Sequence, residues 1–252
     1  MWANQMKDTL TIAVHSPRGG TGKTSVAINL ACAYAKEGKD VCLLDMDLKS
    51  PSTFNGMFPP SGKWINDIFD YKKNIREVIV DGSKSIASES RFYVGYSNPE
   101  ISAIREFSSK DRKWQSNALK ALIQSKKNLR KEGFDIVIMD TSPGVDFTSA
   151  NVVASSDYVL MVVKPNEYCL TNIKQAIDGI YAPLGKKCGI VENMCLNEQS
   201  LQMGEKYGVP VLTSIPCMCE VSAHGLSKIF TVEEPSHPFS SSIDRLKNSI
   251  NY

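Results

Sequence analysis

The sequence predicts an α/β fold: a single domain, residues 1–252, with a mostly parallel, twisted and doubly wound sheet that carries helices on both faces. Two observations support this prediction. Short apolar runs alternate with helical patterns along the whole chain, an order that places helices between parallel strands. The apolar runs also contain few polar positions, as expected of strands covered on both faces. A sheet of this kind binds its ligands beyond the carboxyl ends of its strands.

The first elements have the clearest patterns. Residues 10–14 form an apolar run typical of a strand, and residues 23–36 repeat apolar side chains at helical spacing. Gly38 is a suitable residue to end that helix. A second buried strand, residues 40–47, ends in acids.

The rest of the chain repeats this alternation after a less regular stretch, residues 48–110. Apolar runs predict the strands, and apolar residues at three- and four-residue spacing predict the helices. In chain order, the remaining predicted elements are a strand at 91–96, a helix from Trp114 to Gly133, strands at 135–140, 158–163, 188–191 and 209–215, and a short helix at 243–250.

The composition predicts a cytoplasmic protein with reduced thiols. Lys and Arg number 29 against 27 Asp and Glu, so net charge alone favours neither a nucleic acid nor an acidic membrane as partner. The first residues lack the pattern of a secretory signal. No apolar run approaches the roughly 20 residues of a transmembrane helix. The 7 cysteines stand mostly within apolar patterns, which is untypical of a disulfide framework.

The stretch SPRGGTGKTS, residues 16–25, is typical of a phosphate-binding loop between a strand and a helix. Its glycines let backbone N–H groups point at phosphate oxygens, and the helix start adds a positive dipole end. Lys23 is expected to reach the β- and γ-phosphates, and Thr24 to offer its hydroxyl to Mg²⁺. A glycine-rich turn without a ligand is the alternative. The predicted nucleotide-binding residues here are Gly19, Gly20, Thr21, Gly22, Lys23, Thr24 and Ser25.

Acids at two other strand ends support a nucleotide site. Asp140 ends an apolar run, as does the acid of a Walker B strand that orients Mg²⁺. Asp45 and Asp47 end the second strand and share a face if that strand stays extended. One of them could orient a water for attack on the γ-phosphate. The alternative is a solvated, capped strand end.

Three motifs together resemble the deviant-Walker-A ATPases of the ParA/MinD/Mrp group: RGGTGKT, LLDMDLKSPS and FDIVIMDTSPG. The later segments GIVENM and YGVPVLTSIP extend the resemblance over nearly the whole chain. It implies a P-loop NTPase fold that binds ATP with Mg²⁺ and forms a homodimer with ATP sandwiched between the subunits. Hydrolysis to ADP and phosphate then releases the dimer, so the protein would act as a switch that positions or assembles a partner.

The resemblance also assigns roles to individual residues. Lys23 and Thr24 become phosphate and Mg²⁺ ligands, and residues 140–144 become the second switch loop. The other implied roles are water activation by Asp47, support of the metal shell by Asp45, the Walker B function of Asp140, and contacts to adenine by Asn193 and the backbone at Pro216.

Arg18 occupies the position of the group's signature lysine, which crosses the dimer interface to the partner's phosphates. Arginine keeps the charge and can donate two N–H groups to one phosphate. It is bulkier than lysine, so a plain surface cation is the alternative role. A nucleotide-binding scaffold with negligible turnover is the function that would follow if Arg18 cannot replace the lysine.

The cargo stays open between three alternatives. The basic stretch 110–131 could contact DNA or be a solvated helix face, and no basic amphipathic tail of the membrane-docking type follows the last predicted helix. Cys217 and Cys219, with His224 nearby, could hold a metal or an iron–sulfur cluster between two subunits, as in a carrier of the Mrp type. That branch places its cysteine pair elsewhere, where this chain has only Cys195. An activating partner protein is expected with each of these cargoes.

Overall fold

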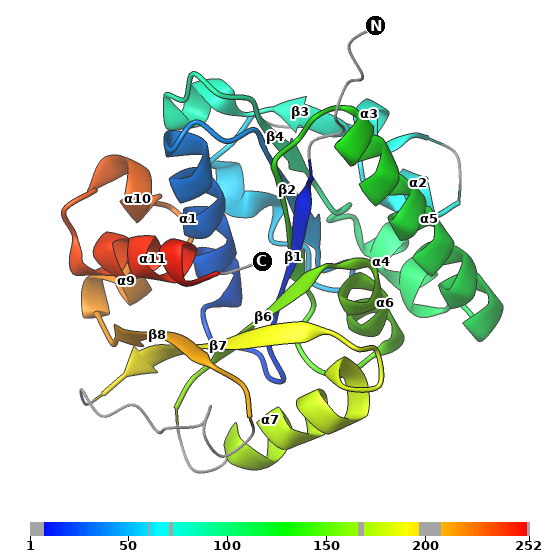
Figure 1. The fold of residues 1–252 in the computed structure, drawn as a ribbon. Helices are drawn as coiled ribbons and strands as arrows, with labels where there is room; N and C mark the ends of the chain where they lie inside the picture. Colours follow the sequence, from blue (N-terminus) through cyan, green and yellow to red (C-terminus); the bar gives the residue numbers. More distant parts are fainter. Residues whose placement is uncertain (1–7, 60, 71–72, 166–168, 197–207, 251–252) are drawn as a thin grey trace, which may run out of the picture.

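The computed structural model describes residues 8–59, 61–70, 73–165, 169–196 and 208–250 (Figure 1). In these residues one sheet has the strand order β3-β4-β2-β5-β1-β6-β7-β8, and only the β3–β4 pair is antiparallel. The predicted α/β fold class is therefore confirmed. The strands are β1 Leu10–His15, β2 Val41–Met46, β3 Ile79–Asp81, β4 Phe92–Gly95, β5 Ile136–Thr141, β6 Tyr158–Val163, β7 Lys187–Cys195 and β8 Val211–Pro216.

Helices cover both faces of the sheet. On one face α1 packs against α10 and α11, and on the other α5 packs against α6 and α2 (Figure 1). The α-helices are α1 Lys23–Lys36, α2 Asn66–Phe69, α3 Ile75–Val78, α4 Ile101–Ser108, α5 Arg112–Lys131, α6 Phe147–Ser155, α7 Cys169–Ala176, α9 Cys219–His224, α10 Phe230–Glu233 and α11 Pro238–Ser249. Two 3-10 turns, Thr53–Gly56 and Ser83–Ile86, and a π-helical segment η3, Ile177–Tyr181, complete the order. None of the described helices combines the length and the apolar character that crossing a membrane requires.

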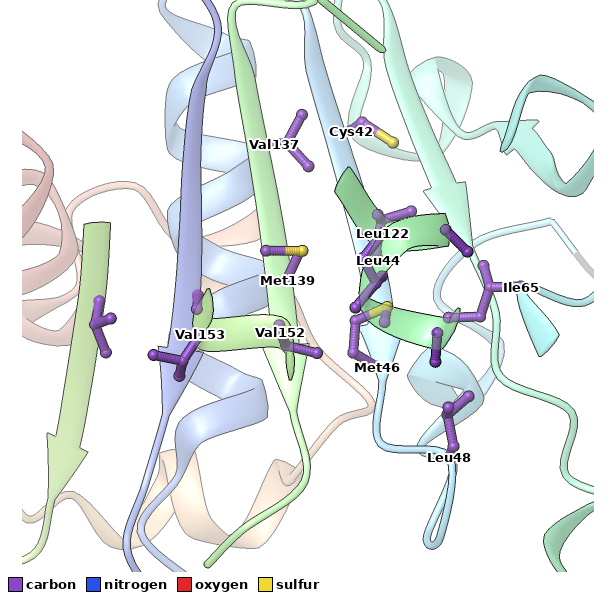
Figure 2. Close-up of a cluster of buried hydrophobic side chains, with 14 of the residues drawn as sticks. Cys42, Leu44, Met46, Leu48, Ile65, Leu122, Val137, Met139, Val152 and Val153 are labelled. Carbon is purple, nitrogen blue, oxygen red and sulfur yellow. The ribbon is translucent and has the colours of Figure 1, made fainter. Parts of the chain in front are cut away.

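The strand alternation divides the core into two layers. In β2, Cys42, Leu44 and Met46 enter the layer under α5 and α6, where Figure 2 shows them beside Leu122 and Val152. Val41 and Leu43, on the other face of the strand, enter the layer under α1 instead. Both faces of β2 are thus buried, which explains why its sequence is apolar at nearly every position.

The predicted elements are present with small differences at their ends. The first helix has the predicted bounds, and β7 continues to Cys195 because β8 pairs with it there. Gly38 has a φ of +86° just beyond α1, a left-handed conformation that suits glycine. The irregular stretch 48–110 contains β3, β4 and several helices of four to eight residues. Of these the sequence predicted only β4.

The topology brings the predicted site together. The strands β1, β2 and β5 are parallel neighbours, so the phosphate loop, Asp45 and Asp140 all stand at one carboxyl edge. Asp45 and Asp140 are direct register partners across β2 and β5.

Candidate functional site

The loop between β1 and α1 has the backbone of a phosphate cradle. Gly20 and Gly22 have φ values of +74° and +79°, a region that disfavours residues with a Cβ. A Cβ at Gly22 would lie 2.3 Å from Asn193 Nδ2, which donates a hydrogen bond of 2.8 Å to the Thr21 carbonyl. The loop therefore requires glycine at position 22 both for its conformation and for the close approach of Asn193.

Lys23 and Thr24 converge on one buried carboxylate. Lys23 Nζ donates to Asp140 Oδ1 at 2.6 Å, and Thr24 Oγ1 donates to Asp140 Oδ2 at 2.7 Å. Asp140 has no solvent exposure, so each of its oxygens depends on these partners. The cluster joins a cation that can bind phosphate to a hydroxyl and a carboxylate that can ligate Mg²⁺.

Asp45 organises the loop after β2. Its Oδ1 accepts from the Asp47 amide at 3.1 Å, and its Oδ2 accepts from the amide and hydroxyl of Ser52 at 3.0 and 3.1 Å. Burial, and next the charge of Asp140, raise the pKa of Asp45 to about 7 against the effect of these hydrogen bonds. Both oxygens of Asp45 thus hold the loop, while its charge adjoins that of Asp140.

Asp47 has different surroundings. The strand ends at Met46, so Asp47 lies in the loop, where its Oδ1 accepts from the Ser50 amide at 3.0 Å. It lines a cavity of about 280 Å³ together with residues 18–25 of the phosphate loop. Burial raises its pKa. Asp47 is therefore the one of the three predicted acids that lines the cavity beside the phosphate loop, among the residues described.

A second cavity, of about 190 Å³, adjoins the first because Gly22 and Ser25 line both. Asn193 and Pro216 line it, and their contact with adenine stays a prediction. Its apolar lining is suited to a flat, uncharged ring. The sequence did not predict these lining residues, although they gather around the last strand and helices: Met194, Met218, Val221 and Phe239.

The donor set fits Mg²⁺ and a nucleoside triphosphate. The oxygens of Thr24, Asp47 and Asp140 are hard ligands of the kind that Mg²⁺ binds. Ser142 Oγ, two residues after Asp140, is buried and has no hydrogen-bond partner in the described structure. A buried hydroxyl of this kind has unused capacity for a ligand or water.

Arg18 is exposed at the mouth of the phosphate cavity, beside exposed Gly19 and Gly20. Its backbone amide donates to Ser16 Oγ at 3.3 Å. No ion pair of its guanidinium occurs within the described part of the chain. Its charge is thus free to meet an anion, either solvent-borne or carried by another molecule.

The cysteine pair lies at the same edge of the sheet. Cys217 and Cys219 are exposed, and the Cys217 amide donates to the carbonyl of Cys195 at 2.8 Å. Within the described ranges, no three His, Cys, Asp or Glu side chains form a group suited to a metal ion. One chain therefore offers two thiols here, with His224 outside any such group.

Comparisons with known proteins agree with this geometry. A family model described as an AAA domain matches residues 9–183. The septum site-determining protein MinD of Thermotoga maritima is 27% identical over 194 residues, 76% of this chain and 62% of that protein. The cytosolic Fe-S cluster assembly factor NUBP2 of Rattus norvegicus is 29% identical over 227 residues, 81% of this chain and 78% of that protein.

The fold is also found among solved structures. The cell division ATPase MinD of Pyrococcus furiosus superposes with a TM-score of 0.78 at 22% identity, covering 96% of this chain and 98% of that chain. The chain spans just under two thirds of the Thermotoga protein and of a Methanocaldococcus jannaschii relative, 62% and 65% of their lengths. That relative is 26% identical over 175 residues, 68% of this chain.

Proposed function

The chain belongs to the AAA-domain family, as a P-loop ATPase of the ParA/MinD/Mrp type, and from that premise we propose that it is a Mg²⁺-dependent ATPase that dimerises on ATP and separates after hydrolysis. In this function the dimer is the active state of a switch that positions or assembles a partner. The observation that carries the proposal is the meeting of Lys23, Thr24 and Asp140 beside a cavity that Asp47 lines.

Each residue has a definite task in this mechanism. Lys23 exchanges its Asp140 partner for the phosphates, which the loop N–H groups also bind. Thr24 and Asp140 would hold Mg²⁺, which neutralises phosphate charge when bound. Asp47 orients the attacking water, and its raised pKa brings this carboxylate closer to the basicity that suits proton acceptance. Asn193 and Pro216 border the base.

We propose that Arg18 acts on the phosphates of the partner subunit. Its exposure, and the lack of a counter-ion for it in the described residues, support this role. An apolar patch lies elsewhere on the surface: Val145, Phe147 and Leu184 are 59%, 58% and 42% exposed and line one cavity. A contiguous patch of this kind is typical of a protein contact surface.

A mixing experiment tests both assignments at once. Asp47→Ala and Arg18→Ala should each bind ATP and each hydrolyse it about 100-fold more slowly, because each lacks one group that acts in the reaction. If Arg18 acts across the interface, mixed dimers regain one complete site, and an equimolar mixture should recover up to about a quarter of wild-type activity. Phosphate release measures turnover, and light scattering measures the ATP-dependent dimer.

Asp178→Ala is the matched control, since Asp178 is an exposed acid that pairs only with Lys174 among the described side chains. It should hydrolyse ATP like the wild type. An Asp47→Ala protein with wild-type turnover would contradict the role of Asp47. A mixture as inactive as its components would contradict action of Arg18 across the interface, and a wild type that stays monomeric with ATP would contradict the switch.

A second candidate function is transport of a metal or iron–sulfur cluster, which the similarity to NUBP2 favours. The exposed pair Cys217 and Cys219 would supply two thiolates from each of two subunits. Metal and sulfide analysis of anaerobically purified protein tests this candidate.

For the partner, we propose α5 as a surface for duplex DNA. Its 20 residues include seven Lys and Arg and no Asp or Glu. The apolar side of α5 is buried in the core. Its exposed side is basic, with Ile123 as a single exposed apolar residue, and lacks the apolar stripe that interfacial membrane helices use. Lys126 and Arg130 are paired with Asp157 and Asp8, which leaves five exposed cations on the helix for a phosphate backbone.

A further inference from the structure

His15 is a fully buried residue at the end of β1, directly before the phosphate loop. Its Nε2 is bonded to the Gly144 carbonyl at 2.9 Å, and its Nδ1 is bonded to the Tyr181 hydroxyl. His15 therefore links β1 to two segments far away in the chain.

The partners determine the state of the imidazole. A carbonyl oxygen can only accept, so Nε2 carries the proton and Nδ1 accepts from Tyr181. Burial, together with the charge of Lys23, lowers the pKa of His15 to about 4 against the opposing effect of the bond to Gly144. Burial raises the pKa of Tyr181 well above its usual value, so its hydroxyl keeps the proton that it donates. Tyr181 thus selects the tautomer that can bind Gly144.

Gly144 receives bonds from several sides. Its amide donates to the Ser16 carbonyl at 2.9 Å, and its carbonyl accepts from Ser149 Oγ at 2.9 Å as well as from His15. Its φ of +85° is a left-handed conformation. At the other end of the segment, Thr141 Oγ1 donates to the Val14 carbonyl at 3.0 Å. Residues 141–144 are therefore fixed at both ends to β1 and the first residue of the phosphate loop.

The middle of this segment is different. Ser142 is only 2% exposed, yet its hydroxyl has no hydrogen-bond partner in the described structure. A polar atom left unpaired in the interior costs free energy, so its place must be enforced by the surrounding bonds. The bonds at Thr141 and Gly144 are the ones that enforce it.

We propose that His15 is a positioning residue that fixes residues 141–144 against the phosphate loop and thereby holds the Ser142 hydroxyl, two residues after Asp140, in place for the phosphoryl-transfer site. Tyr181 orients His15, and it can reach the end of β1 because it closes the π-helical segment η3, Ile177–Tyr181. Such segments are frequent at functional sites. The effect of His15 on turnover rests on the proposed ATPase function, whereas its fixing of residues 141–144 does not depend on that function.

Hydrogen–deuterium exchange of the nucleotide-free protein tests the structural part. In His15→Leu the Gly144 amide should exchange about tenfold faster, because the residue loses one of the bonds that hold it beside Ser16. In His15→Gln, whose side-chain amide can still donate to the Gly144 carbonyl, exchange should stay within about twofold of the wild type. Tyr181→Phe should lie between the two.

Steady-state kinetics test the effect on turnover. The kcat of His15→Leu should fall about tenfold while the KM for ATP changes less than about twofold, and His15→Gln should recover most of the kcat. Tyr158→Phe is the control, since Tyr158 is another buried tyrosine that lines the same cavity as Tyr181. It should leave both the exchange and the kcat unchanged.

Three results would overturn the proposal: faster exchange spread evenly over β1 and β5, a kcat that follows thermal stability in every variant including Tyr158→Phe, or a KM that rises at constant kcat. The ATPase function and the positioning role of His15 can be tested separately. If the wild type does not hydrolyse ATP, the proposed function fails, whereas the exchange of Gly144 still decides whether His15 positions this segment.

Discussion

Hydrogen bonds separate the roles of the three acids of the candidate site, Asp45, Asp47 and Asp140. Asp140 accepts hydrogen bonds from Lys23 and Thr24. Both carboxylate oxygens of Asp45 accept hydrogen bonds from the loop that carries Asp47. Only Asp47, among the described acids, lines the cavity beside the phosphate loop. The carboxylate proposed to orient water is thus held by a second carboxylate that need not touch the substrate.

Sequence could predict which acids gather, but it could not assign these tasks. The pattern of apolar runs ending in Asp placed Asp45 and Asp140 at one edge, as register pairing confirms. The different roles of Asp45 and Asp47 depend on the residue at which β2 ends and on the hydrogen bonds from Ser52. Neither can be derived from the spacing of residues in the sequence. His15 was missed for the same reason, since its partners Gly144 and Tyr181 are 129 and 166 residues away.

The buried imidazole of His15 predicts a pH dependence of stability. Its pKa in the folded protein, about 4, lies below the usual 6.5, so the stability that neutral His15 contributes is complete above pH 6.5 and is lost as the pH falls towards 4. Replacing His15 by Gln removes this titration. Between pH 6.5 and 4.5 the variant should therefore lose less unfolding free energy than the wild type, by about 2 kcal/mol.

Urea unfolding at several pH values measures the difference. Asp45 acts in the opposite sense, because its pKa of about 7 makes stability fall as the pH rises from about 4 towards 7. This contribution is present in both proteins and cancels in the comparison. Parallel curves for wild type and His15→Gln over the range would contradict a buried, neutral His15.

At the scale of elements, sequence patterns predicted what is long and periodic. Clear apolar patterns, typical of burial in a sheet that is covered on both faces, occur in α1, β1, β2, β5 and β6. The edge strand β3 has three residues and α2 and α3 have four each, too few to show a period. Their places are set by tertiary contacts: a Cβ at Gly95 of β4 would lie 2.8 Å from Ile65 Cγ2, so glycine permits that close approach.

The helix α5 carries the prediction for DNA. Lys113, Lys120 and Lys127 are exposed at seven-residue spacing, so they follow one face of the helix about 10 Å apart. Replacing all three by Gln should weaken binding to duplex DNA at least about tenfold at low salt and reduce the salt slope by about 2 to 3, because three phosphate contacts are removed. Fluorescence anisotropy of labelled duplexes over a salt series measures both quantities.

The control is a triple Gln variant of exposed lysines on other parts of the surface, Lys39, Lys63 and Lys84. It lowers the net charge equally but leaves α5 intact. A loss of affinity as large as that of the α5 variant would show that net charge alone governs binding, and a wild type without measurable affinity would remove DNA from the proposed partners.

At the scale of the whole molecule, one chain leaves three features of its surface incomplete. Arg18 has no counter-ion in the described structure, the patch of Val145, Phe147 and Leu184 is uncovered, and Cys217 and Cys219 offer only two thiols. Arg18 and the cysteine pair follow the carboxyl ends of β1 and β8, so pairing of two copies through the carboxyl edge of the sheet would place both features of each copy at one interface. The proposed switch and the proposed carrier would then share this dimer and differ in whether the four thiols hold a metal.

Metal content decides between them. Because one chain offers only two of the four thiolates that a carrier would need, we expect anaerobically purified, nucleotide-free protein to contain less than about 0.1 Fe or Zn per chain. Cys217→Ser/Cys219→Ser should then dimerise with ATP and hydrolyse it like the wild type. The control Cys188→Ser alters a half-buried thiol on β7 and should behave identically. About one metal ion or cluster per dimer, lost in the double variant and retained in the control, would contradict this expectation and establish the carrier.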